Sequence, residues 1–232
     1  MPRLIFLRAG ALALAGLSAA ACTTTQSPAP ALAYAAAPRI GPNEARMYAA
    51  ETDHGWQIPA ADPQTIEPRN VRQVVDYPTT QPRGTIIVDP QARFLYLVME
   101  NGKALRYGVG VGKAGMEFTG EGIVARKASW PHWTPTPDMI KREPEKYGGE
   151  LRDGMAGGIQ NPLGTRALYL FKHGRDTLYR IHGTNQAWSI GKAVSSGCIR
   201  MLNQDVIDLE RRVPKGSRVV VLGSSAETGE TS

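Results

Sequence analysis

Long hydrophobic runs, cysteine and aromatic residues are all scarce in this chain of 232 residues. No apolar stretch reaches the roughly 20 residues that span a bilayer, which excludes a polytopic membrane protein. Cys22 and Cys198 are the only cysteines, so a disulfide framework is excluded if Cys22 is lipidated or removed. Aromatic residues make up 7% of the chain, whereas 25 Gly and 17 Pro favour short strands and turns over long helices. The 42% of hydrophobic residues still suffices for one ordinary core.

The amino terminus has the form of a bacterial export signal over residues 1–21. Arg3 and Arg8 precede an apolar stretch, Ala9–Ala21, that is too short to cross a membrane. The small residues directly before Cys22 resemble a lipoprotein signal, in which the thiol receives diacylglycerol. We therefore expect an envelope protein of the periplasm that is anchored to the outer membrane by a lipid on Cys22. Cleavage at an Ala-x-Ala site, which leaves a soluble periplasmic protein, is the alternative.

The charge of the chain is positive but modest. The full sequence carries a net charge of +6, and loss of Arg3 and Arg8 leaves 25 basic and 21 acidic residues, a net charge of +4. No run of Lys and Arg accompanies this excess. We therefore expect no nucleic-acid partner.

The composition changes near residue 84. Residues 22–83 are rich in Ala and Pro, and we expect a tether with at most one short helix, Pro42–Thr52. Beyond them, β-rich runs alternate with turn residues. The predicted strands are Thr85–Asp89, Phe94–Met99, Ala104–Val111, Gly122–Ser129, Arg166–Phe171, Leu178–Ile181 and Ser217–Leu222. Asn101-Gly102, between two of these runs, is typical of a type I′ hairpin turn.

One helix is predicted near the carboxyl end, from Asn203 as its cap to about Val213. Val206, Leu209 and Val213 share the spacing of one apolar face. The predicted fold is therefore mainly β, a β-sandwich or barrel-like domain with one C-terminal helix and long loops. Residues 223–232 are polar, and we expect a disordered tail.

The segment from Ile181 to Met201 carries the chemistry. Cys198 is a nucleophile only as its thiolate, so it needs a base or a cation beside it. His182 lies sixteen residues earlier, a separation that allows a strand end, a loop and a return into the same cleft. Gly183 leaves room for close approach, and Gly197 frees the turn before the cysteine so that amides there can face a developing oxyanion. This arrangement permits nucleophilic catalysis by Cys198, and a small buried thiol with a structural role is the alternative.

The order of the motif resembles one family. His182-Gly183, followed by Ser195-x-Gly-Cys-Ile-Arg200, is similar to the signature of the L,D-transpeptidase catalytic domain, the YkuD-type enzymes of bacterial cell walls. The similarity covers residues 84–222, the predicted catalytic domain. Two further blocks, Trp133-Thr-Pro-Thr-Pro137 with Met139 and Asn161-Pro-Leu-Gly164, resemble loops of the Gram-negative envelope branch of that family.

The resemblance implies a role for each matching residue. Cys198 is implied as the nucleophile, His182 as its base and later acid, and the Gly183 carbonyl as the group that orients the imidazole. Backbone amides of Gly197 and Cys198 are implied as the oxyanion donors. The implied substrate-binding residues are Arg200, which can hold a carboxylate through two hydrogen bonds, together with Ser195 and Ser196. Many members carry histidine where this chain has Ser196.

The resemblance also implies a reaction. The thiolate attacks the carbonyl between diaminopimelate and the terminal D-Ala of a tetrapeptide stem of peptidoglycan, D-Ala departs, and an amine takes the acyl group. The acceptor is a second diaminopimelate or a lysine of a wall-anchored lipoprotein. No metal or organic cofactor is implied. The alternatives are a thiol hydrolase that uses water as acceptor and a peptidoglycan-binding lipoprotein without activity.

Other chemistry-bearing residues have simpler interpretations. A zinc site at Cys198 and His182 needs further ligands, which the sequence does not place nearby. We expect Trp188 and Tyr169 to lie in the core rather than to serve as platforms on which sugars stack.

Overall fold

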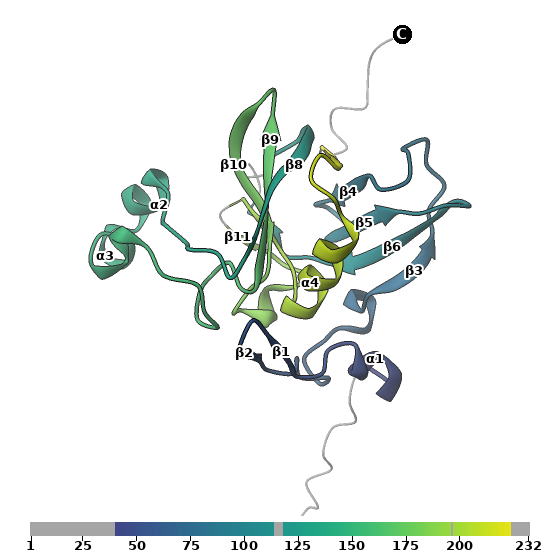
Figure 1. Ribbon diagram of the computed structural model, residues 1–232, viewed down its shortest axis with the longest axis horizontal. Helices are drawn as coiled ribbons and strands as arrows, with labels where there is room; N and C mark the ends of the chain where they lie inside the picture. The colour runs from purple at the N-terminus through teal and green to yellow at the C-terminus, as the bar shows by residue number, and fades with distance from the viewer. Residues whose placement is uncertain (1–39, 114–117, 196, 224–232) are drawn as a thin grey trace, which may run out of the picture. The chain divides into compact units, whose positions relative to one another are not determined.

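A mixed sheet of nine strands dominates the computed structural model, which describes residues 40–113, 118–195 and 197–223 (Figure 1). The expected export signal 1–21, Cys22 with the start of the expected tether, Ser196, and the tail from residue 224 lie outside the described residues. No helix in the described ranges has the length and hydrophobicity needed to cross a membrane.

The strand order of the sheet is β12-β10-β9-β8-β13-β4-β5-β6-β3. The pairs β10–β12 and β4–β13 are parallel, and the other neighbours are antiparallel. The strands are β3 (Gln73–Asp76), β4 (Ile86–Asp89), β5 (Phe94–Val98), β6 (Lys103–Gly108), β8 (Gly120–Ser129), β9 (Arg166–Lys172), β10 (Arg175–His182), β12 (Ile199–Arg200) and β13 (Arg218–Val221). The predicted mainly β class is confirmed.

Shorter elements surround this sheet. Two small sheets pair β1 (Glu51–Asp53) with β2 (Trp56–Ile58) and β7 (Val111–Gly112) with β11 (Ala193–Ser195). The helices are α1 (Pro42–Arg46), α2 (Pro137–Arg142), α3 (Pro144–Tyr147) and α4 (Asn203–Arg212), with 3-10 turns η1 (Pro68–Asn70), η2 (Glu150–Asp153) and η3 (Ala187–Ser189). In Figure 1, α2 and α3 lie to one side of β8, β9 and β10.

The β5–β6 hairpin confirms the turn that was predicted at Asn101-Gly102. Asn101 and Gly102 have φ angles of 58° and 64°, the left-handed values that a type I′ turn needs. The register then pairs Val98 with Ala104. Because side chains alternate between the two faces of a strand, this turn fixes which residues of both strands enter the core.

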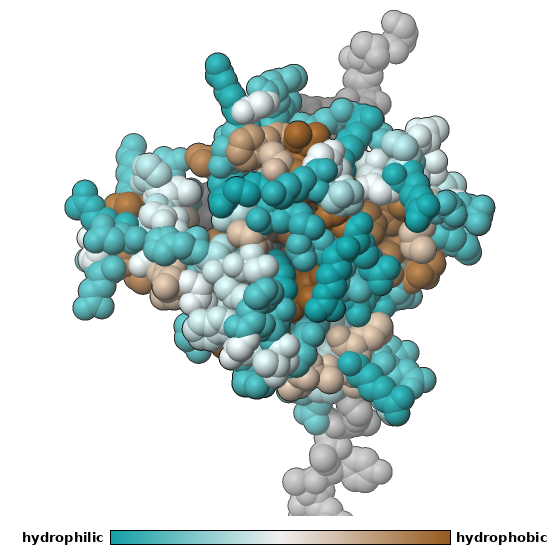
Figure 2. Space-filling view, in the orientation of Figure 1, coloured by the Kyte–Doolittle hydropathy of each residue, from teal (hydrophilic) through white to brown (hydrophobic). Residues whose placement is uncertain are grey.

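Helix α4 packs on the sheet through the predicted apolar face. Val206, Leu209 and Val213 are at most 1% exposed and share one core cluster with residues of β4, β9 and β10. On the face viewed in Figure 2, hydrophilic side chains cover the outside of α4 and apolar ones show beside it. The predicted cap is wrong by one residue, because Leu202 is the N-cap. Asn203 is the first residue of the helix, and its side chain forms hydrogen bonds with Thr165 and Thr184.

The segment 40–76, which we call the N-terminal strap, is more ordered than the sequence predicted. A tether was predicted over residues 22–83, but residues 40–83 contain η1, a β1–β2 hairpin and the edge strand β3. The predicted helix to Thr52 ends at Arg46. Tyr48 is fully buried in a cluster that also holds Ile190 and Leu202. The strap has too few apolar residues to show the periodicity of a helix or strand. These residues are nevertheless buried by contacts with distant parts of the chain.

Polar contacts also hold the strap. The Arg166 guanidinium, in β9, donates to both carboxylate oxygens of Asp53 at 2.8 and 2.7 Å, and Trp130 Nε1 donates to Asp53 at 2.8 Å. The bonds from Arg166 hold the pKa of Asp53 well below its usual range. Asp205, fully buried in α4, lies 3.5 Å from Arg72 and 3.4 Å from the Tyr48 hydroxyl. Burial raises the pKa of Asp205 to about 7, although the Arg72 charge opposes that shift.

Replacing Asp53 with Ala tests whether the strap belongs to the folding unit. Arg166 is 3% exposed, so its charge would lose its main partner while still buried. We expect the free energy of unfolding to fall by about 3 kcal/mol at pH 7. The stabilising contribution of Asp53 is present above the ordinary carboxyl pKa and is lost as the pH falls through its lowered folded value. Urea unfolding followed by circular dichroism measures both effects.

Asp76→Ala is the matched control for this measurement. Asp76 also belongs to the strap and pairs with Lys103, but both side chains are exposed. An exposed pair contributes less than about 1 kcal/mol. Equal, small losses in the two variants would show that the strap does not stabilise the sheet.

Candidate active site

The end of the sheet at β10 and β12 carries His182 and adjoins Cys198. The parallel register pairs Ile181 with Ile199 and His182 with Arg200. Ile181 and Ile199 are buried in the core, so His182 and Arg200 project to the opposite face. Cys198 directly precedes β12, and its sulfur lies near the Leu178 carbonyl of β10. The parallel register therefore places Cys198 next to the part of β10 that ends at His182.

Small residues leave room beside the histidine. Ala167 of β9 is opposite His182, and Ala128 of β8 is opposite Ala167. Directly opposite residues project to the same face, so the row across the sheet reads Ala128, Ala167, His182, Arg200. Side chains from the loops after β8 pack over this row. The cluster that includes Ala167 also contains Trp133, Leu163 and Tyr169, with Tyr147 of α3 packed against it.

His182 is oriented by its own neighbour in the chain. The residue is 4% exposed, and its Nδ1 lies 2.5 Å from the Gly183 carbonyl oxygen. A carbonyl only accepts, so Nδ1 carries the proton and Nε2 keeps its lone pair. The structure thus leaves Nε2 as the nitrogen able to accept a proton.

The loop after His182 is fixed by residues that the sequence interpretation assigned to other roles. Asn203 Oδ1 accepts from Thr165 N at 3.0 Å, and its Nδ2 donates to Thr184 O at 3.1 Å. Gly164, with φ of 60°, has no space for a Cβ, which would lie 2.7 Å from the Gly183 carbonyl carbon. The Asn-Pro-Leu-Gly block therefore supports the backbone of Gly183. Gly164 could have indicated this tight backbone contact from the sequence. No residue near Asn203 indicated that its side chain would support the loop after His182.

Cys198 is a free, partly exposed cysteine next to a bulge in β10. The register between β9 and β10 shifts between Asp176 and Arg180, and Leu178 within this bulge has φ of 64°. The Leu178 carbonyl oxygen lies 3.9 Å from Cys198 Sγ, as a weak acceptor for the thiol proton. Bulges are common beside active sites because they redirect single groups. Here the bulge brings a carbonyl to the sulfur.

The two side chains are both neutral at rest. Burial raises the pKa of the Cys198 thiol, against the lowering effects of the Arg180 backbone N–H and of the Arg180 and Arg200 charges. Burial lowers the pKa of His182 to about 4, and the same two guanidinium groups lower it further while the Gly183 carbonyl opposes the shift. A thiolate–imidazolium pair is therefore disfavoured before a substrate arrives.

The turn before Cys198 is closed by Ser195. Ser195 is 2% exposed, and its hydroxyl donates to the Cys198 carbonyl at 2.7 Å and accepts from Gly197 N at 3.2 Å. The hydroxyl is thus engaged by the backbone of this turn. It also accepts from the Gly197 amide, which was predicted as an oxyanion donor. Gly197 has φ of 121°, which explains the glycine.

Arg200 faces the site but is not unpartnered. Its Nη1 donates to Gln186 Oε1 at 2.9 Å. Burial lowers its pKa, and the neighbouring Cys198 and Tyr147 oppose that shift. A carboxylate that binds Arg200 would therefore either displace the Gln186 side chain or bind beside it.

A second cationic row was not predicted. Arg126 of β8 and Arg180 of β10 are both opposite Tyr169, and their guanidinium groups lie 3.4 and 4.4 Å from the centre of its ring. Arg180 also forms a two-pronged pair with Asp176 at 2.6 and 2.9 Å. Tyr169 is 6% exposed, which confirms its predicted core position. The prediction for Trp188 is wrong, because 56% of that residue is exposed.

A metal site was not predicted. Within the described ranges, no group of three or more His, Cys, Asp or Glu side chains is arranged to hold a metal ion.

Comparison with known proteins gives a family match to the part of the chain that carries this site. The family model described as the L,D-transpeptidase catalytic domain matches residues 83–221. The match includes His182, Arg200 and the residues opposite them in the sheet, and it excludes the whole N-terminal strap.

Curated relatives point to the same family. "Probable L,D-transpeptidase ErfK/SrfK" from Escherichia coli (strain K12) is 36% identical over 169 residues, 71% of this chain and 53% of that protein. "Probable L,D-transpeptidase YbiS" from the same organism is 36% identical over 152 residues, 65% of this chain and 48% of that protein. The chain spans about half the length of these relatives.

One solved structure is closer in sequence. A crystal structure described as a probable carnitine operon oxidoreductase caia from Brucella melitensis is 51% identical and covers 68% of this chain and 97% of that chain. Its TM-score is 0.47, too low to bear on fold or function.

Proposed function

Because the chain belongs to the L,D-transpeptidase catalytic domain family, we propose that it is a peptidoglycan L,D-transpeptidase. Its donor substrate is a tetrapeptide stem. The Cys198 sulfur attacks the carbonyl carbon of diaminopimelate, the bond to the terminal D-Ala breaks, and a thioester remains. An amine then attacks the thioester, forms the new amide and releases the sulfur. The proposal is supported by the parallel register, which pairs His182 with Arg200 two residues after Cys198, and by the Gly183 carbonyl, which leaves His182 Nε2 able to accept a proton.

Proton transfer accompanies the attack. The thiol proton moves to His182 Nε2 as the carbon–sulfur bond forms, because the neutral resting pair gains nothing from ionising earlier. The resulting imidazolium donates the same proton to the nitrogen of the departing D-Ala. The Gly183 carbonyl supports the imidazolium through Nδ1 at 2.5 Å. Arg180 and Arg200 stabilise negative charge as it develops on sulfur and on the carbonyl oxygen.

The backbone amide of Cys198 is the proposed oxyanion donor. The Gly197 amide is engaged by the Ser195 hydroxyl, so it contributes only if that bond opens. Arg200 is proposed to hold a carboxylate of the stem peptide in place of, or together with, Gln186. Ser196 lies outside the described residues and stays a proposed substrate contact.

The acceptor and the location of the enzyme are further parts of the proposal. The acceptor is a second diaminopimelate, which gives a 3-3 cross-link, or the lysine of a wall-anchored lipoprotein. Both acceptors place the enzyme in the periplasm, where a lipid on Cys22 would hold it to the outer membrane. A role in cell-wall organisation and cell shape follows from cross-linking.

Incubation of the purified chain with disaccharide-tetrapeptides tests this function. We expect release of D-Ala and a cross-linked dimer, identified by mass spectrometry of the products. Accumulation of tripeptide without dimer would instead identify a hydrolase, because water then takes the acyl group. Absence of D-Ala release from a folded, reduced protein would contradict an enzymatic function and leave the wall-binding alternative.

A further inference from the structure

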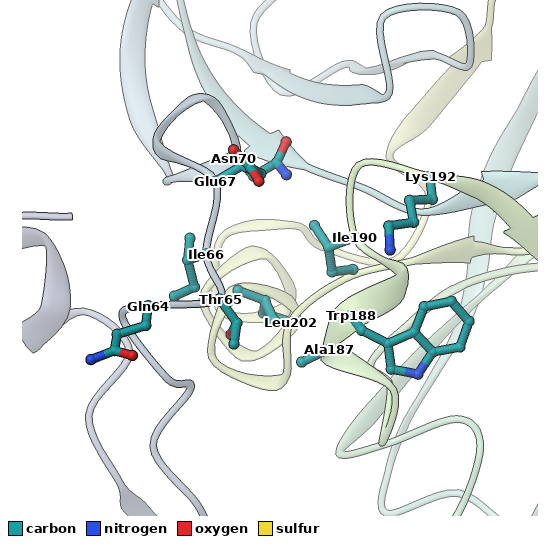
Figure 3. Close-up of a pocket in the computed structure, with 10 residues that line it drawn as sticks. All are labelled: Gln64, Thr65, Ile66, Glu67, Asn70, Ala187, Trp188, Ile190, Lys192 and Leu202. Carbon is teal, nitrogen blue, oxygen red and sulfur yellow. The ribbon is translucent and has the colours of Figure 1, made fainter. Parts of the chain in front are cut away.

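A cavity of about 300 Å³ lies beside the connection that joins His182 to Cys198. One wall is formed by that connection and the other by the N-terminal strap, as Figure 3 shows. Its lining residues are Gln64, Thr65, Ile66, Glu67, Asn70, Ala187, Trp188, Ile190, Lys192 and Leu202. A volume of this size suits one small ligand unit.

The wall on the catalytic side presents an unusual aromatic side chain. Trp188 is 56% exposed, although it is the largest apolar residue type. Lys192 Nζ lies 5.2 Å from the centre of its ring, and Figure 3 shows both side chains on the same side of the cavity. An exposed indole beside a cavity marks a contact surface more often than a structural need.

The opposite wall contains a buried amide oxygen that lacks a hydrogen-bond donor. Asn70 is 4% exposed, and its Oδ1 has no hydrogen-bond partner among the described residues. Buried acceptors without donors are rare in folded proteins, so each one indicates a missing partner. Ile66, Ile190 and Leu202 are buried nearby and add an apolar floor.

We propose that this cavity binds an N-acetylated amino sugar of the glycan strand to which stem peptides are attached. The inference rests on the proposed function, because it assumes a peptidoglycan substrate. A pyranose ring has an apolar face of C–H groups, which suits the Trp188 indole. The acetamido methyl suits the apolar floor, and sugar oxygens can accept from Lys192 Nζ. The acetamido N–H can donate to Asn70 Oδ1 once the side chains that now cover this buried atom shift.

The place of the cavity gives the sugar a role in catalysis. Gln186, directly before the cavity wall, holds Arg200, which neighbours Cys198. A sugar that contacts Trp188 therefore orders the same connection that presents the thiol. Binding energy from a remote part of a substrate can serve to position its reacting part. The enzyme should accordingly prefer a stem attached to its disaccharide over a free peptide.

Two substrates separate this role from general catalysis. The purified chain and its Trp188→Ala variant are each given a disaccharide-tetrapeptide and the free tetrapeptide, and kcat/KM is measured from D-Ala release. We expect Trp188→Ala to lower kcat/KM about ten-fold on the disaccharide-tetrapeptide and to leave the free peptide unchanged. Trp56→Ala is the matched control, since Trp56 is also exposed, at 42%, but does not line the cavity.

Binding of a peptide-free tetramer of N-acetylglucosamine gives an independent measurement. We expect the tetramer to change the tryptophan fluorescence of the chain and of Trp56→Ala but not of Trp188→Ala. A wild-type chain that shows no change and uses both substrates equally would overturn the inference. Sugar binding without any D-Ala release would support the inference while contradicting the proposed function. D-Ala release without sugar binding or substrate preference would support the proposed function and contradict the inference about the cavity.

Discussion

Cys198→Ala is expected to abolish acyl transfer, lowering D-Ala release by a factor on the order of 10⁵ or more. The alanine has no atom that can attack a carbonyl, and no thioester can form. In the unaltered chain, the donor should increase the mass of the peptide containing Cys198 by the acyl group. Mass spectrometry of the quenched reaction measures this increment directly.

The second cysteine of the chain provides the control for this variant. Cys22→Ser removes the other thiol, and we expect its rate to equal that of the unaltered chain. Cys198 is only partly buried, so Cys198→Ala should keep its circular dichroism spectrum and unfolding midpoint. A folded Cys198→Ala protein that still releases D-Ala would show that another residue is the nucleophile.

His182→Gln is expected to lower kcat/KM by about 10² to 10⁴ at pH 7. Glutamine can still donate to the Gly183 carbonyl, but it cannot accept the thiol proton. The pH dependence separates loss of the base from loss of structure. In the unaltered chain, kcat/KM should fall only as the pH drops through about 4, where His182 becomes protonated.

The variant should lack this acidic decrease. Its rate should instead rise with pH, because burial raises the pKa of the Cys198 thiol and only alkaline solution then supplies thiolate. His173→Gln, in the β9–β10 turn, is the matched control and should behave like the unaltered chain. An acidic decrease centred near pH 6.5 in the unaltered chain would contradict the buried, neutral histidine described above.

The sequence singled out His182 and Cys198 because that information is local. His182 follows a β-rich run, and the sixteen residues up to Cys198 allow a loop and a return into the same cleft. The short strand β12 after Cys198 was not predicted. The hairpin at Asn101-Gly102 and the apolar face of α4 were predictable for the same reason. Each depends on residues within a few positions of one another, where turn chemistry and periodicity act.

The strap could not be predicted, because its stability depends on distant residues. Asp53 resembles any surface carboxylate until Arg166, 113 positions later, meets it. Tyr48 stands alone in a segment rich in Ala and Pro, and its hydroxyl finds partners in Arg72 and Asp205 only in the fold. Composition therefore predicted a tether where tertiary contacts make an ordered structure.

The prediction for Trp188 failed because it concerned the direction in which a side chain points. Ser195, a predicted substrate contact, has its hydroxyl bonded within the turn that includes Cys198. Trp188 was expected in the core because tryptophan is usually buried there. Neither a spacing nor a neighbouring residue revealed which way these side chains face.

The edge strand β3 has a consequence for where the protein can be cut. The family match begins at residue 83, whereas β3 lies at Gln73–Asp76 and pairs with β6 along four residues. Excision at the family boundary would leave the backbone donors and acceptors of β6 without partners. Such an open edge invites strands from other molecules and so promotes aggregation. The family model therefore covers less of the chain than the unit that folds.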